Sequence, residues 1–135
     1  MKTHLLFIGG SKNELSDFLE ALGRVPEDDG FKCTYAITVS QGLEMLKYLV
    51  PDHILLNDVN TEDECMQFMA VITMRPKLDA VKIHLYGGDE IIANRLGIPD
   101  CIRKCESVEA LATQLTSILA QPQIADSLMG NTEDN

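Results

Sequence analysis

The chain has 135 residues, of which 45% are hydrophobic, and it carries a formal charge of −10. This length fits one domain with a hydrophobic core. The acidic balance argues against nucleic acids and anionic membranes as partners, because contacts to phosphate groups need Lys and Arg, and it favours basic protein surfaces. No apolar run approaches the ~20 residues that span a bilayer, and no signal-peptide core is visible, so we expect a cytoplasmic protein.

Short apolar runs alternate with amphipathic stretches, a pattern typical of α/β proteins with a parallel sheet. The run Leu5–Ile8 is continuous rather than alternating, which indicates a strand buried on both faces. The predicted strands, in chain order, are 5–8, 31–39, 53–57, 81–86 and 101–104.

A helix is predicted after each of these strands. The pairs Ser11/Glu14 and Thr61/Glu64 have the spacing of capping boxes. Single residues that can cap a helix begin the other three. The predicted N-cap residues of the five helices are Ser11, Ser40, Thr61, Asp89 and Ser107. Pro51 is expected to end the second helix and Gly97 the fourth.

Residues 51–58 read Pro-Asp-His-Ile-Leu-Leu-Asn-Asp and close the third predicted strand. This segment resembles the third strand of response-regulator receiver domains, Pro-Asp-Leu-Ile-Leu-Leu-Asp, in which the last Asp takes a phosphoryl group. The matching position here is Asn57, whose amide cannot form an acyl phosphate. Segment 42–46 resembles the start of the second receiver helix, and segment 96–104 resembles the stretch that leads to the receiver's strand-five lysine.

The resemblance covers roughly residues 2–120. It implies a single doubly wound (βα)5 three-layer sandwich, with a parallel five-stranded sheet of flavodoxin-like order 2-1-3-4-5. We therefore expect a receiver-like domain at 1–120 and a flexible C-terminal tail at 121–135.

Receivers hold magnesium with two acidic residues at the end of their first strand. Gly9 and Gly10 stand at those positions here and offer no side-chain oxygen, whereas Mg²⁺ requires hard oxygen ligands. The resemblance therefore implies that magnesium binding is lost or weak. We expect no cofactor, no metal and no catalytic residue.

Lys104 matches the strand-five lysine of receivers. Tyr86 or Gly87 matches the Thr or Ser at the end of strand four of receivers, whose hydroxyl responds to the phosphoryl state. Receivers continue after the lysine with a proline in a cis bond, but Cys105 stands there. Because a cis bond before a non-proline residue costs about 2.5–4 kcal/mol, we expect a trans bond that re-aims Lys104 or reshapes its loop.

Asp58 is an alternative phosphoacceptor, displaced by one residue from Asn57. Neighbouring strand residues point to opposite faces, so Asp58 is expected to point away from the cleft unless a bulge re-aims it. Otherwise it is a solvated loop acid or a cap for the next helix.

The pair Gly9-Gly10 also allows a second kind of site. Backbone amides at the start of a helix can cradle an anion, and Lys104 would add positive charge. The sequence is neither a G-x-G-x-x-G motif nor a P-loop, so a tight turn is the plainer interpretation.

Residues that could bind metal or form disulfides are scattered. The strand register places His4, His53 and His84 on different faces or at different ends of their strands, so we expect no shared metal site. Free, partly buried thiols are expected at Cys33, Cys65, Cys101 and Cys105.

The favoured function is a stand-alone receiver-like signalling domain that works without phosphorylation, through protein–protein contacts, and is not an enzyme. Its partners would be other signalling proteins, and a homodimer stays open. Ile91 and Ile92 on the fourth helix are candidate contact residues. The alternatives are a two-component regulator phosphorylated at Asp58 and a flavodoxin-like module that binds a small anion or nucleotide.

Overall fold

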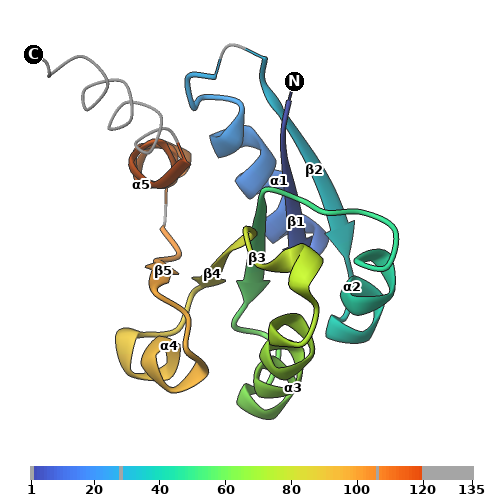
Figure 1. Ribbon diagram of the computed structural model, residues 1–135. Helices are drawn as coiled ribbons and strands as arrows, with labels where there is room; N and C mark the ends of the chain where they lie inside the picture. The colour runs from blue at the N-terminus through green and yellow to red at the C-terminus, as the bar shows by residue number, and fades with distance from the viewer. Residues whose placement is uncertain (1, 28, 106, 120–135) are drawn as a thin grey trace, which may run out of the picture.

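The computed structural model describes residues 2–27, 29–105 and 107–119. The tail predicted at 121–135 lies outside the described residues. A parallel sheet runs through the molecule in the order β2-β1-β3-β4-β5, which confirms the predicted doubly wound fold (Figure 1). Its strands are β1 (Thr3–Ile8), β2 (Phe31–Ala36), β3 (His53–Asn57), β4 (Lys82–Tyr86) and β5 (Asp100–Ile102).

Helices cover both faces of the sheet, as a doubly wound connection requires. Their bounds are α1 (Lys12–Leu22), α2 (Val39–Met45), α3 (Glu62–Thr73), α4 (Glu90–Leu96) and α5 (Val108–Leu119), with a 3-10 turn at Pro76–Leu78. Helices α1 and α5 pack on one face, and α2, α3 and α4 pack on the other. None of the described helices is long and apolar enough to cross a membrane.

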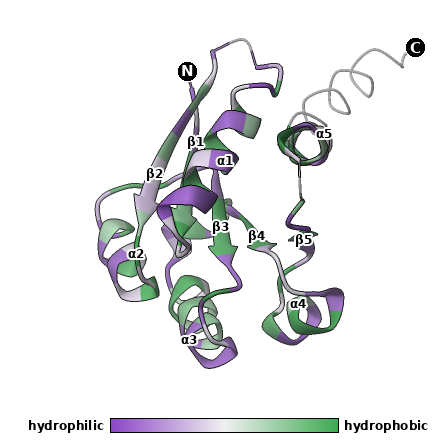
Figure 2. Cartoon of the chain, turned by 180° about the vertical axis from the view of Figure 1, so that it is seen from behind, coloured by the Kyte–Doolittle hydropathy of each residue, from purple (hydrophilic) through white to green (hydrophobic). Residues whose placement is uncertain are grey.

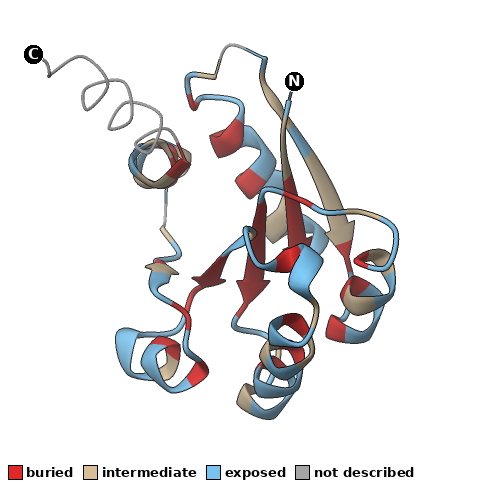
Figure 3. Cartoon of the chain, in the orientation of Figure 1, coloured by how far each residue is buried: buried red, intermediate tan, exposed pale blue. Residues whose placement is uncertain are grey.

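The core consists of two layers, one on each face of the sheet. Leu5 and Phe7 of β1 belong to the layer under α1 and α5, while Leu6 and Ile8 belong to the layer under α2, α3 and α4. All four side chains are fully buried, so β1 is apolar at every position from Leu5 to Ile8 rather than at every second one. The central strands are accordingly buried in Figure 3, and β3 is mostly hydrophobic in Figure 2.

Most of the predicted helix signals are confirmed. Both capping boxes form, at Ser11 and at Thr61. Asp89 caps α4, and Gly97 ends that helix in the left-handed region with φ 75°. The Ser107 hydroxyl accepts a hydrogen bond from the Ala110 amide at the start of α5.

The prediction for the second helix is wrong at both ends. Thr38, not Ser40, caps α2, because its hydroxyl accepts the Gln41 amide while the Gln41 side chain accepts the Ile37 amide. The capping pair at 37–41 also ends β2 at Ala36, three residues before the predicted end. The helix then stops at Met45, well short of Pro51.

Three further predictions about the elements need correction. Strand β5 ends at Ile102, so Lys104 lies in the loop beyond it rather than at the end of the strand. The sequence pattern places Leu19 and Val50 on the apolar stripes of the first and second helices, but these residues are 44% and 52% exposed. On α4, Ile91 is exposed whereas Ile92 is half-buried and packs against the core.

Candidate functional site

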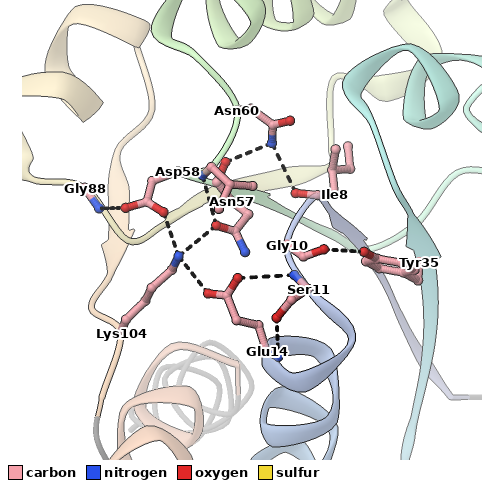
Figure 4. Close-up of polar contacts among 11 residues, drawn as sticks. Ile8, Gly10, Ser11, Glu14, Tyr35, Asn57, Asp58, Asn60, Gly88 and Lys104 are labelled. Carbon is pink, nitrogen blue, oxygen red and sulfur yellow. Dashed lines mark hydrogen bonds and ion pairs between the residues drawn. The ribbon is translucent and has the colours of Figure 1, made fainter.

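Four polar side chains converge at the carboxyl ends of the strands (Figure 4). They are Glu14 from the first turn of α1, Asn57 from the end of β3, Asp58 from the residue after it, and Lys104 from the β5–α5 loop. We call these four residues the strand-end cluster. The Lys104 Nζ lies 2.6 Å from Asp58 Oδ1, 2.8 Å from Glu14 Oε2 and 2.9 Å from Asn57 Oδ1.

Asn57, which matches the phosphoacceptor of receivers, is fully buried. Its Oδ1 accepts hydrogen bonds from the Lys104 ammonium and from the Val59 amide at 3.1 Å. Its Nδ2 is buried and has no hydrogen-bond partner in the described part of the chain. The amide has its acceptor in use and its donor unpaired, and it offers no nucleophile.

Asp58 points into the cluster, so the expectation that it would point away is wrong. Its Oδ1 pairs with Lys104, and its Oδ2 accepts the Gly88 amide at 3.0 Å. The alternation of side chains no longer applies, because β3 ends at Asn57. Asp58 does not cap the next helix either, since the Thr61 side chain does.

Gly87 leaves the space that the Asp58 carboxylate occupies. A Cβ atom at Gly87 would lie 2.5 Å from Asp58 Oδ2, so a side chain there would have to displace the carboxylate. The residue also adopts φ +90°, which L side chains rarely adopt. Gly87 is one of the two positions that match the Thr or Ser of receivers, and the acid of the β3–α3 loop fills the space beside it.

Lys104 reaches Asn57 although the bond to Cys105 is trans, as expected. Of the two expected consequences, a re-aimed Lys104 or a reshaped loop, the contact with Asn57 speaks against the first. Burial lowers the pKa of Lys104, but its hydrogen bonds to Asp58 and Glu14 and their charges outweigh this effect and raise its pKa above 10.5. The ammonium is held in its charged form.

Gly9 and Gly10 form a tight turn rather than an anion cradle. The Gly9 amide donates to the Ala36 carbonyl at 2.8 Å, and the amide of Ser11 faces a Glu14 carboxylate oxygen. A Cβ atom at Gly10 would lie 2.7 Å from Asn57 Nδ2 and 3.0 Å from Glu14 Oε1. The amides of Gly9 and Ser11 are thus bound internally, and a carboxylate stands beside them.

Glu14 is the residue of the cluster that the sequence reading did not identify as part of the site. The sequence indicated Glu14 as the second member of a capping box, and this structural role was sufficient to account for an acid at that position. One carboxylate oxygen does approach the Ser11 amide, but the other pairs with Lys104. Its position in the sequence could have indicated the site. An acid in the first turn of α1, just after Gly9 and Gly10, lies at the carboxyl edge of the sheet, where sites of open α/β sheets form.

Tyr86 lies level with Asn57 in the β3–β4 register and belongs to the core on the α1/α5 face. Its ring packs against Phe7 and Phe18, with centroids 5.4 and 5.9 Å apart, and the residue is only 4% exposed. The Lys104 ammonium lies 5.6 Å from the ring centroid. Burial, helped by the nearby charge of Glu14, raises the pKa of Tyr86 to about 12, so the hydroxyl stays protonated.

The histidines do not gather at the site. His4 bonds Thr34, and Leu5 is level with His53, as the register predicted. His53 and His84, however, touch: the His53 Nδ1 and His84 Nε2 atoms are 2.9 Å apart, because residues on the diagonal of neighbouring strands are within side-chain reach. Burial lowers the pKa of His53 to about 4 and also lowers that of His84, so both rings are neutral.

Side chains that could bind a metal ion do not cluster in the described ranges. No group of three or more His, Cys, Asp or Glu side chains there could hold a metal ion. The four cysteines are free thiols. Burial raises the pKa of Cys33 and of Cys65 to about 11, which keeps both as unreactive thiols.

Comparison with known proteins identifies the fold. Neither protein-family models nor curated sequences give a match. Among solved structures, the phosphorylated cyanobacterial phytochrome response regulator RcpA is 15% identical, with a TM-score of 0.72 over 87% of this chain and 91% of that one. The chemotaxis response regulator CheY4 of Vibrio cholerae is 16% identical, with a TM-score of 0.68 over 88% of this chain and 100% of that one.

The Mn²⁺-bound form of the response regulator Rcp1 is similar to the same extent, with 16% identity and a TM-score of 0.66 over 86% of this chain and 91% of that one. Further response regulators match with equal probability. At such low sequence identity the likeness concerns the fold: the chain has the receiver fold of two-component response regulators.

Proposed function

We propose that this chain is a receiver-like signalling domain that works without aspartyl phosphorylation, through contacts with other signalling proteins. A receiver is a two-state element whose equilibrium phosphorylation shifts. One structural neighbour is described as phosphorylated and another as Mn²⁺-bound. In this chain the same region carries an amide and two glycines in place of the carboxylates that such chemistry requires.

The observation that carries the proposal is the state of Lys104. Its ammonium is already bound by oxygens of Asp58, Glu14 and Asn57. The two carboxylates outnumber the one ammonium, so the cluster repels an incoming phosphoryl donor. The contacts that a phosphoryl group would make are replaced by internal ones, which favours a single resting state governed by a partner.

Asp58 supports a second candidate, a regulator phosphorylated at a displaced acceptor. Its carboxylate lies beside Lys104, and its side chain is 38% exposed. Against this candidate, both carboxylate oxygens are engaged, by Lys104 and by the Gly88 amide. The third candidate, an anion or nucleotide site at Gly9-Gly10, has less support, because Glu14 faces those amides.

Intact-mass spectrometry after incubation with acetyl phosphate and Mg²⁺ separates the first two candidates. RcpA treated in parallel serves as the positive control for the reagents. We expect no added phosphate on the chain. An adduct that disappears in Asp58→Asn, while Asp63→Asn keeps it, would contradict the proposal and establish Asp58 as the acceptor.

A second measurement covers adducts that hydrolyse too quickly to be seen. Beryllofluoride with Mg²⁺ mimics a bound phosphoryl group without turnover. We expect the ¹H–¹⁵N spectrum of the chain to stay unchanged when both are added. Shifts centred on Asp58 and Lys104 would show a working acceptor site.

Partner contacts are proposed at α4. Ile91 is 66% exposed, whereas its neighbour Ile92 packs against the core, so only Ile91 is available to another protein. A homodimer through this face remains one form of the proposal. Light scattering across a concentration series tests it, and Ile91→Asp should shift any dimer to monomer.

A further inference from the structure

A cavity of about 190 Å³ opens between α1 and α5, beside the strand-end cluster. Its polar lining includes Glu14 and Asp17 from α1, Tyr86 from β4 and Lys104. Val108 and Leu111 of α5 supply apolar walls. The two helices lie on the same face of the sheet (Figure 1). The cavity lining includes Tyr86 and Leu111 of the core layer on that face and does not include Asn57.

The floor of the cavity holds an unpaired polar group. Tyr86 is 4% exposed, and its ring is enclosed by Phe7 and Phe18. In the part of the chain that the structure describes, no protein group forms a hydrogen bond with its hydroxyl. The hydroxyl is not sealed in the core, since the buried side-chain polar atoms without a partner in the described residues are Asn57 Nδ2 and His84 Nδ1. It opens to the cavity, where it can bond water or a ligand.

The charges around the cavity select the sign of that ligand. Glu14 and Asp17 lie three residues apart, on one face of α1. The single ammonium, that of Lys104, is already paired with Glu14 and with Asp58. Two carboxylates and one ammonium therefore line the cavity, and the Asp58 carboxylate pairs with that ammonium from outside it, so the local charge is negative and disfavours an anionic ligand.

Size and lining restrict the ligand further. The cavity is smaller than the ~300–1,000 Å³ of sites for drug-sized molecules, so only a few heavy atoms fit. The ring of Tyr86 and the side chains of Val108 and Leu111 suit methylene groups, and the face of an aromatic ring attracts a cation. A compact metal ion would leave these apolar walls without contacts.

We propose that the cavity between α1 and α5 binds a small organic cation, a short aliphatic primary amine or diamine. Its ammonium would donate to the Asp17 and Glu14 carboxylates and to the Tyr86 hydroxyl, and its methylenes would lie against Val108 and Leu111. This site does not depend on whether the chain is phosphorylated, because neither Asn57 nor an acyl phosphate takes part. The ligand would lie beside the strand-end cluster and would have the opposite sign to a phosphoryl group.

Titration of the full ¹⁵N-labelled chain at low salt tests the proposal. The probes are 1,4-diaminobutane, n-butylamine and sodium butyrate, the last two sharing a carbon skeleton but differing in charge. We expect saturable shifts of amide signals in α1 and at Val108 and Leu111 with both amines, at dissociation constants of order 1 mM, and none with butyrate. Asp17→Asn and Tyr86→Phe should each weaken binding by about 5- to 10-fold, which corresponds to roughly 1–1.4 kcal/mol.

The control variant is Asp63→Asn, which removes one exposed acid from the first turn of α3, on the opposite face of the sheet. It should bind the amines as the wild type does. Equal shifts with butyrate, shifts that fail to saturate by about 50 mM amine, or unchanged affinity in Asp17→Asn would each overturn the proposal. Asp17 is exposed, so its variant keeps the fold even if Tyr86→Phe perturbs the core.

Discussion

Replacing Lys104 with methionine is the most direct test of how the strand-end cluster is held together. Methionine keeps most of the aliphatic stem but removes the ammonium that joins Asp58, Glu14 and Asn57. The two carboxylates would then face each other without a counter-charge. The Asn57 Oδ1 would keep only the Val59 amide as a donor.

The magnitude follows from the contacts and their exposure. A fully exposed ion pair contributes about 0.2–1 kcal/mol, and a hydrogen bond to a charged group contributes about 1.5–3 kcal/mol when water is excluded. The side chains here are about one-third exposed: 33% for Lys104, 38% for Asp58 and 29% for Glu14. We therefore expect Lys104→Met to lower the free energy of unfolding by about 2 kcal/mol and Tm by roughly 5–10 °C.

Urea denaturation measures this change, with Lys77→Met as the matched control. The Lys77 ammonium donates to a backbone carbonyl, that of Lys47, and its variant should cost less than about 0.5 kcal/mol. The pH dependence adds a second readout. Because the pKa of Lys104 is raised in the folded state, its contribution is complete below pH 10.5 and is lost as the pH rises through the folded pKa.

The stabilities of wild type and Lys104→Met should therefore converge at high pH. Equal stability of the two proteins at pH 7 would refute this account of the cluster. A difference that persists unchanged well above the pKa of the lysine would also refute it, since it would then arise from packing rather than from charge.

Three further predictions concern neighbouring features. Gly87→Ala should lower the free energy of unfolding by about 1–2 kcal/mol more than Gly97→Ala, as measured by thermal denaturation. Both residues have positive φ, but only the added Cβ at Gly87 meets the Asp58 carboxylate. Equal losses in the two variants would contradict this contact. The free energy of unfolding should fall by up to about 3 kcal/mol between pH 6.5 and about 4, because His53 takes up a proton at higher pH in the unfolded state than in the folded state. His53→Phe should lessen this fall. A pH dependence of urea denaturation that is unchanged in the variant would count against a buried neutral pair. Asn57→Asp should still gain no phosphate from acetyl phosphate in intact-mass spectrometry, because Gly9 and Gly10 supply no side-chain ligand for magnesium. An adduct would show that the amide of Asn57 alone prevents phosphorylation.

Much of the fold was predictable because its signals are local. Continuous apolar runs marked strands buried on both faces, and the capping boxes at Ser11 and Thr61 marked helix starts. The boundaries that failed had competing local signals. Thr38 and Ser40 are both good caps, and the reciprocal bonds of Gln41 favour Thr38.

The site was only partly predictable, because its geometry depends on loops. The positions of Asn57 and Lys104 followed from the resemblance to receivers. The direction of Asp58 did not, since it depends on the missing side chain at Gly87, some 30 residues further along the chain. Glu14 was hidden by its second role in a capping box.

The sequence by itself determined the alternation of strands and helices, the absence of carboxylates from the positions where receivers bind magnesium, and the acidic surface. These are properties of residue type and short-range spacing, and they need no knowledge of what lies across the sheet. The tertiary structure alone decided which groups surround Lys104, why Asp58 turns inward, and that His53 meets His84. Such contacts join residues that lie far apart in the chain, and their geometry depends on the strand register and on which neighbours lack a side chain.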